Sequence, residues 1–121
     1  MNSIVNWFEI PTANLDRAVR FYETMLGIRL KLETFNGTQQ AMLLGDKDDA
    51  SGSLIADPRR KPTADGTLVY LNAKKDLDSC LDRATRAGGR VVLPKTDIGD
   101  PGFIAIVADT EGNHVALHME K

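Results

Sequence analysis

The sequence predicts an α+β fold made of two tandem βαβββ modules, and three observations support this prediction. A strand followed by an amphipathic helix opens the chain within residues 4–30. Strand-like runs separated by turn residues come next, and the whole order of elements then returns in the second half. Shifting the sequence by about 62 residues, a longer period than that of solenoid repeats, places Leu15 on Leu77 and Gly27 on Gly89.

The opening unit contains the clearest local signals. Val5–Ile10 is expected to be a strand that Pro11 ends, because proline cannot donate to a β-ladder. Asn14 is the expected N-cap of the helix, and Gly27 is the expected C′ residue. A further strand with alternating polarity is expected over residues 28–32. The helix has an apolar stripe formed by Leu15, Ala18, Val19, Tyr22, Met25 and Leu26.

The rest of the first module reads as β-structure. Asn36-Gly37 predicts a hairpin turn before a strand at residues 39–44. A polar turn at residues 45–50 precedes a short strand at residues 51–56. Residues 57–65 include two prolines and three cations without periodicity, which is typical of a linker.

The second module repeats the pattern. We expect a strand at residues 66–73, a strand at 90–93, a loop at 94–102 and two strands at 103–108 and 114–119. One domain over residues 1–121 therefore consists of module 1 (1–56), a linker (57–65) and module 2 (66–121). The second helix has an apolar stripe of Leu77, Cys80, Leu81, Ala84 and Ala87, and Gly88-Gly89 ends it.

Composition limits the function. With 121 residues and 42% hydrophobic content, the chain suits one domain with a core of its own. A net charge of −2 gives no basic surface for nucleic acid, and no apolar run reaches the ~20 residues of a membrane span. The N-terminus has no signal-peptide pattern, and the single Cys80 excludes an internal disulfide. We therefore expect a cytoplasmic protein with neither nucleic acid nor a membrane as partner.

Two segments resemble the vicinal oxygen chelate superfamily, which includes glyoxalase I, bleomycin-resistance proteins and extradiol dioxygenases. They are LDRAVRFYETMLG at residues 15–27 and DTEGN at residues 109–113, and the resemblance extends over essentially the whole chain. It implies a cup-shaped half-barrel of mixed and antiparallel strands with the helices outside. It also implies a homodimer, and, in metal-dependent members, a divalent ion in the cup.

The residues at the positions that the resemblance assigns to metal ligands are unsuited to that role. Trp7 and Val69 stand at the first-strand positions, Ala116 replaces a glutamate in the last strand, and the 62-residue shift relates Ala116 to Leu54. A divalent site needs about three oxygen or imidazole donors, and these side chains supply none. We expect no cofactor, with a divalent metal at a displaced site as the alternative.

Other side chains are expected to line the cup. Glu9 shares a strand face with Trp7, and His114, Ala116 and His118 share a face because they are two residues apart. Glu9 and His118 are the candidate catalytic pair, since a carboxylate and an imidazole can act as acid and base or as displaced metal ligands. The candidate ligand-binding set is Trp7, Glu9, Leu54, Val69, His114, Ala116 and His118.

Three functions compete at this stage. The first is a protein that binds a small organic molecule in its cup, similar to metal-free bleomycin-resistance proteins. The second is a lyase or isomerase that uses Glu9 and His118. The third is a structural or regulatory module whose cup is filled by side chains. The absence of ligand-type side chains at Trp7, Val69 and Ala116 favours the first, and a glycine-containing loop at residues 95–102 is expected to form a lid or rim.

Overall fold

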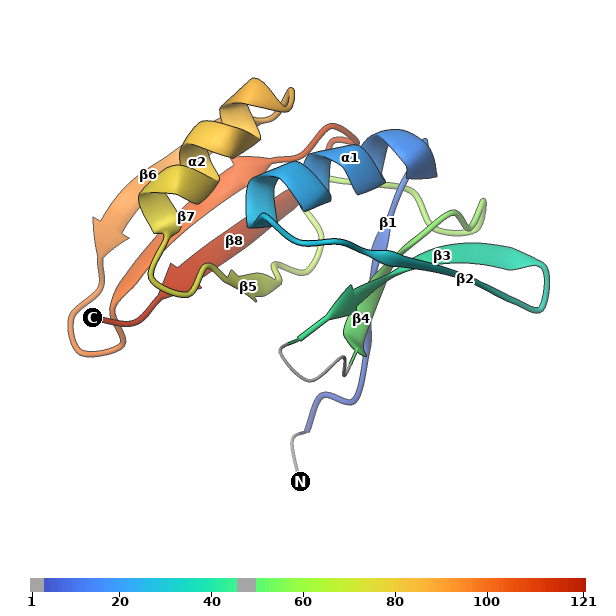
Figure 1. Ribbon diagram of the computed structural model, residues 1–121, viewed down its shortest axis with the longest axis horizontal. Coiled ribbons are helices and arrows are strands. Elements are labelled where there is room, and N and C mark those ends of the chain that lie inside the picture. The colour runs from blue at the N-terminus through green and yellow to red at the C-terminus, as the bar shows by residue number, and fades with distance from the viewer. Residues whose placement is uncertain (1–3, 46–49) are drawn as a thin grey trace.

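The structure, a computed structural model, describes residues 4–45 and 50–121 (Figure 1). Within these ranges no helix is long and apolar enough to cross a bilayer. The elements of the first half are β1 (Phe8–Pro11), α1 (Leu15–Leu26), β2 (Lys31–Phe35), β3 (Thr38–Leu44) and β4 (Ala50–Ile55). Those of the second half are β5 (Tyr70–Asn72), α2 (Leu77–Arg86), β6 (Arg90–Asp97), β7 (Phe103–Ala108) and β8 (His114–Met119).

Each half forms one four-stranded mixed sheet. The strand orders are β1-β4-β3-β2 and β5-β8-β7-β6. In both sheets the first strand pairs in parallel with the last strand of its own half, and the remaining pairs are antiparallel. The two sheets form an open cup with the helices outside it (Figure 1). The predicted α+β fold of two βαβββ modules is therefore confirmed.

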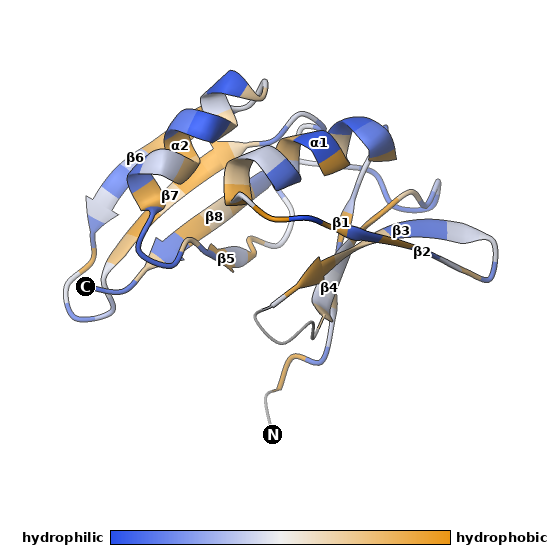
Figure 2. Cartoon of the chain, in the orientation of Figure 1, coloured by the Kyte–Doolittle hydropathy of each residue, from blue (hydrophilic) through white to orange (hydrophobic). Residues whose placement is uncertain are grey.

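A single core joins the two halves. The helices lie side by side (Figure 1) and contact each other as well as the sheets. Figure 2 shows hydrophobic residues along β7 and β8, next to α2. In α1 the predicted stripe is buried except for Val19 and Leu26, which are partly buried. Phe21, which the stripe omitted, is 1% exposed and makes an edge contact with Tyr22.

The ends of α1 follow the sequence signals. The Asn14 side chain accepts a hydrogen bond from the Arg17 N–H, as an N-cap does. Gly27 adopts φ +68°, the left-handed conformation that a helix C′ residue needs. Asn36 and Gly37 both have positive φ, which matches the predicted hairpin turn. The predicted polar turn at residues 45–50 lies mostly outside the described residues.

Two strands of the first module begin later than predicted. β1 begins at Phe8, where pairing with Gly52 of β4 begins, and Val5 stays 66% exposed without a strand neighbour. Residues 28–30 are not a strand, because backbone N–H groups in this segment donate to Glu23 of α1. The Ile28 N–H donates to the Glu23 carbonyl, and the Leu30 N–H donates to the Glu23 carboxylate.

The second module also departs from the prediction. Of the predicted strand at residues 66–73, only Tyr70–Asn72 form a ladder with β8, opposite Ala116–His118. β6 continues through Pro94 to Asp97, where a loop was expected. Register shifts on both sides of Leu93 accommodate the proline, which cannot donate to a ladder. The predicted lid at residues 95–102 is thus the end of β6 and a tight turn.

Candidate functional site

The alternation of side chains along β1 and β4 decides which residues face the cup. Ile10 and Leu54 are opposite each other and belong to the buried core. Glu9 and Ser53 are also opposite each other, and they point to the other face of the sheet. Leu54 is 0% exposed and faces the helices rather than the cup.

The second module shows why Leu54 was wrongly expected in the cup. Leu71 pairs with Leu117, and both belong to the core, just as Ile10 and Leu54 do. Tyr70 then pairs with Ala116 on the cup face. The counterpart of Ala116 in the first module is therefore Ser53. The 62-residue shift aligns the two helices, and in the last strands it relates Ala116 to Leu54, one residue beyond Ser53.

Glu9, Val69 and His114 meet where the two sheets adjoin. They line a cavity of about 360 Å³, here called the seam cavity. Glu9 and His114 bring a carboxylate and an imidazole to it, and Val69 brings an apolar side chain. The other lining residues are Phe8, Ile10, Pro11, Thr63, Gly66, Thr67, Asn113 and Val115.

His118 lies in a different place. It lines a hollow of about 580 Å³ on the second sheet together with Tyr70, Asn72, Ile98 and Ile104. Its Nε2 is 2.7 Å from the carbonyl oxygen of Pro101, which makes Nε2 the donor because a carbonyl can only accept. The candidate pair of Glu9 and His118 is thus divided between two cavities.

Two further predicted residues line neither cavity. Trp7 precedes β1 and is 38% exposed. Ala116 is 0% exposed between Tyr70 and Ile106. Among the residues that the structure describes, no three His, Cys, Asp or Glu side chains come close enough together to hold a metal ion.

The DTEGN segment joins the two modules. Glu111 Oε1 accepts from the backbone N–H groups of Ala13 (2.9 Å) and Asn14 (2.7 Å), at the start of α1. Arg17 Nε donates to Glu111 Oε2 at 2.7 Å, and Thr110 Oγ1 donates to it at 2.9 Å. Burial raises the pKa of Glu111, but the hydrogen bonds from Arg17 and Asn14 outweigh that effect, so its pKa is lowered.

Asp109 is the second contact of this segment with the first module. The Tyr22 hydroxyl donates to Asp109 Oδ2 at 2.6 Å, and Asn113 Nδ2 donates both to the same oxygen and to the Pro11 carbonyl. Burial, followed by the Asp109 carboxylate, raises the pKa of Tyr22 well above its ordinary value. The sequence marked DTEGN as a motif, and the structure shows that its Asp, Glu and Asn side chains hold the modules together.

Comparison with known proteins identifies the family. The family model for the Glyoxalase/Bleomycin resistance protein/Dioxygenase superfamily matches residues 4–117. The chain belongs to this superfamily. Among curated proteins, "Putative glyoxylase CFP32" of Mycobacterium bovis is 26% identical over 117 residues. The match covers 93% of this chain and 44% of that protein, so the chain spans less than half of its relative's length.

Solved structures of the superfamily share the fold. A glyoxalase/bleomycin resistance protein from Albidiferax ferrireducens T118 superimposes with a TM-score of 0.73 at 14% identity, covering 98% of this chain and all of that one. TnmS3, an antibiotic binding protein from Streptomyces sp. CB03234, gives a TM-score of 0.65 at 22% identity, covering 99% and 98%. At these identities the likeness shows the fold alone.

Tyr70 and Asn72 are cup residues that the sequence analysis missed. Both point to the cup face of β5, since Leu71 between them is in the core. Tyr70 is 52% exposed. The available signal was the apolar Leu71: if Leu71 is in the core, its neighbours Tyr70 and Asn72 point to the opposite face. Tyr70 lines the hollow beside His118, and Phe8, rather than Trp7, is the aromatic residue that lines the seam cavity.

Proposed function

We propose that this protein binds a small organic molecule in its cup without a metal ion. The observation on which the proposal rests is the seam cavity, which combines Glu9, Val69 and His114 in about 360 Å³. Pockets for small ligands usually measure about 300–1,000 Å³ and combine an apolar lining with a few polar groups. The printed description of TnmS3 as an antibiotic binding protein supports the same kind of function.

The metal-free part of the proposal rests on the chemistry of four positions. The resemblance to metal-dependent members assigns ligand roles to Trp7, Val69 and Ala116, and structural pairing assigns the fourth to Ser53. Indole, isopropyl and methyl groups donate nothing to a cation, and a lone serine hydroxyl is a weak ligand. These residues do not fit the usual divalent ion.

Glu9 indicates which ligands to test first. A carboxylate at a cavity wall favours a cationic or hydrogen-bond-donating group through charge-assisted hydrogen bonds. Tryptamine and indole-3-acetate have the same aromatic body with opposite charges. We expect tryptamine to bind at least tenfold more tightly in isothermal titration calorimetry, and Glu9→Gln to remove that preference.

His118→Gln is the matched control, because His118 lines the other hollow and its substitution should leave tryptamine affinity unchanged. Equal binding of the two compounds, or loss of binding in His118→Gln alone, would contradict the assignment to the seam cavity. Elemental analysis of purified protein tests the metal-free part. A stoichiometric metal that is lost in both Glu9→Ala and His114→Ala, the two possible donors of the seam cavity, would overturn the metal-free part of the proposal.

We also propose that the protein is a homodimer that pairs through β2. This strand is the outer edge of its sheet, and edge strands have unpaired backbone groups that a second strand can use. Antiparallel pairing centred on Leu32 would place Lys31 opposite Glu33 of the partner subunit, and the reverse. Leu32, now 52% exposed, would contact its symmetry mate. The alternative centred on Glu33 would oppose two carboxylates.

Charge exchange tests this dimer. Lys31→Glu should convert the dimer to a monomer in light scattering coupled to size exclusion, because it opposes like charges at both pairs. Adding Glu33→Lys in the same chain should restore the dimer. A wild-type monomer, or a dimer that Lys31→Glu leaves intact, would refute pairing through β2.

A further inference from the structure

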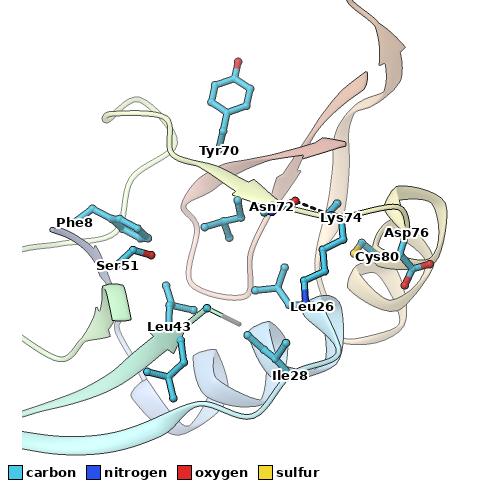
Figure 3. A pocket seen from close by; sticks show the side chains of 14 residues that line it. Phe8, Leu26, Ile28, Leu43, Ser51, Tyr70, Asn72, Lys74, Asp76 and Cys80 are labelled. Atoms are coloured by element: carbon cyan, nitrogen blue, oxygen red, sulfur yellow. Dashed lines mark hydrogen bonds between the residues drawn. The ribbon is translucent and has the colours of Figure 1, made fainter. Parts of the chain in front are cut away.

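A second cavity lies at one end of the core, away from Glu9 and His114. We call it the core-end cavity, and it measures about 350 Å³ (Figure 3). Its walls come from the C-terminal end of α1, the ends of β3 and β4, β5 and the start of α2. The lining residues are Phe8, Leu26, Ile28, Leu43, Leu44, Gly45, Ser51, Tyr70, Leu71, Asn72, Ala73, Lys74, Asp76 and Cys80.

The floor of this cavity is the hydrophobic core itself. Leu43, Leu71, Ala73 and Cys80 are each at most 9% exposed and belong to the core cluster of both modules. In Figure 3 the side chains of Leu26, Ile28 and Leu43 extend into the same space from two sides. An apolar molecule placed there would therefore extend the core rather than cover a polar surface.

Two of the polar side chains at the rim are already engaged within the protein. Asp76 is paired with Arg83 at 3.3 Å, and the Asn72 side chain accepts from the Lys74 N–H at 2.8 Å. Lys74 and Asp76 have opposite charges, and Arg83 adds a second cation beside Asp76. The floor has no charged side chain, so a ligand on the floor is selected by apolar contact rather than by charge.

Arg83 holds the walls in place. Its Nε donates to the Thr24 carbonyl at 2.9 Å and its Nη2 donates to the Met25 carbonyl at 3.0 Å, which joins α2 to the last turn of α1. The cavity is consequently preformed between two helices that these partly exposed hydrogen bonds hold together. A preformed site binds with less loss of conformational entropy than one that must be assembled.

We propose that the core-end cavity is a second small-molecule site, and that it takes a neutral, apolar molecule of about two fused rings. An apolar cavity of about 150 Å³ accepts benzene, so a volume of about 350 Å³ accommodates a molecule about twice that size. Phe8 lines both this cavity and the seam cavity. The two sites are adjacent but differ in chemistry, and binding here does not depend on the proposed function of the cup.

Cys80 makes the proposal directly testable. It is the only cysteine of the chain, it lines the cavity, and it is 2% exposed. Burial raises the pKa of its thiol, so labelling is best followed at mildly alkaline pH. We expect saturating 2-naphthol to slow the reaction of Cys80 with N-ethylmaleimide at least fivefold, as followed by mass spectrometry. The charged analogues 2-naphthoate and 2-naphthylmethylammonium should protect at least tenfold less well.

Two variants that each place a tryptophan in one cavity show where 2-naphthol binds when it protects Cys80. Ile28→Trp fills the core-end cavity and should abolish protection by 2-naphthol. Ile104→Trp fills the hollow beside His118 instead and should retain it. Amide chemical shifts of the wild-type protein provide a readout that needs no variant to fold. Addition of 2-naphthol should move the signals of Ile28 and Ala73 more than that of His114.

The outcomes that overturn the proposal are equally definite. They are the absence of protection up to the solubility of 2-naphthol, protection that persists in Ile28→Trp, and equal protection by the charged analogues. Shifts centred on His114 would assign 2-naphthol to the seam cavity. Tryptamine binding that depends on Glu9 is measured separately, so a failure of one site is distinguishable from a failure of the other.

Discussion

Glu111→Ala should destabilise the protein more than any ordinary surface substitution. The Glu111 side chain is 0% exposed and accepts from the N–H groups of Ala13 and Asn14 and from the Thr110 hydroxyl. Removing it leaves these donors without their acceptor and separates the start of α1 from the second module. Two backbone bonds and one hydroxyl bond, each worth about 1 kcal/mol, give a loss of about 2–3 kcal/mol in the free energy of unfolding.

Urea unfolding followed by circular dichroism measures this loss. With an m-value of about 2 kcal/mol/M, the midpoint should fall by about 1–1.5 M. Glu120→Ala is the matched control, because Glu120 is exposed and its substitution should cost no more than about 0.5 kcal/mol. A loss below about 1 kcal/mol for Glu111→Ala would refute the view that the DTEGN segment fastens the two modules.

The pH dependence of the same difference follows from the lowered pKa of Glu111. A carboxyl whose pKa is lower in the folded than in the unfolded state contributes stability above its unfolded pKa, here about 4.5. That contribution disappears as the pH falls through the folded pKa. The difference between wild type and Glu111→Ala should therefore be constant near neutral pH and shrink below about pH 4.5. A difference that grows in acid would contradict the sign.

Two other substitutions test the packing around the site. Tyr22→Phe removes the hydrogen bond to Asp109 and leaves a buried acceptor short of one donor, so we expect the free energy of unfolding to fall by about 1–3 kcal/mol in thermal or urea unfolding. In the wild-type protein, Tyr22 should remain un-ionised beyond pH 10 in an absorbance titration, because its pKa is raised. Early ionisation of both tyrosines would contradict this raised pKa. Gly102→Ala would place a Cβ against the Met119 carbonyl oxygen at φ +121°, so it should lower the free energy of unfolding by more than about 1 kcal/mol. It should also change the His118 ring signals in NMR. The control Gly37→Ala places its Cβ where nothing lies within 4 Å, and it should leave those ring signals unchanged.

Local signals were sufficient for most of the fold. The Asn14 cap, the Gly27 exit and the Asn36-Gly37 turn depend on backbone conformations that only a few residue types favour, so they are legible in the sequence. The recurrence of the same pattern in the second half then predicts two like modules. Strand lengths were less predictable, since pairing partners rather than side chains decided where β1 and β5 begin.

Alternation along the strands let the sequence place Glu9, His114 and His118 on the cup face, but the 62-residue shift placed Leu54, a core residue, there as well. The sequence favoured His118 as the catalytic partner of Glu9, although four residues of extended chain separate His118 from His114 by about 13 Å. Only the tertiary structure decided that His114 joins Glu9 while His118 binds the Pro101 carbonyl. The same holds for Ser53, whose place opposite Glu9 depends on strand register between segments more than forty residues apart. Register is fixed by which faces are buried when the sheet assembles, and an error of one residue moves a side chain to the opposite face.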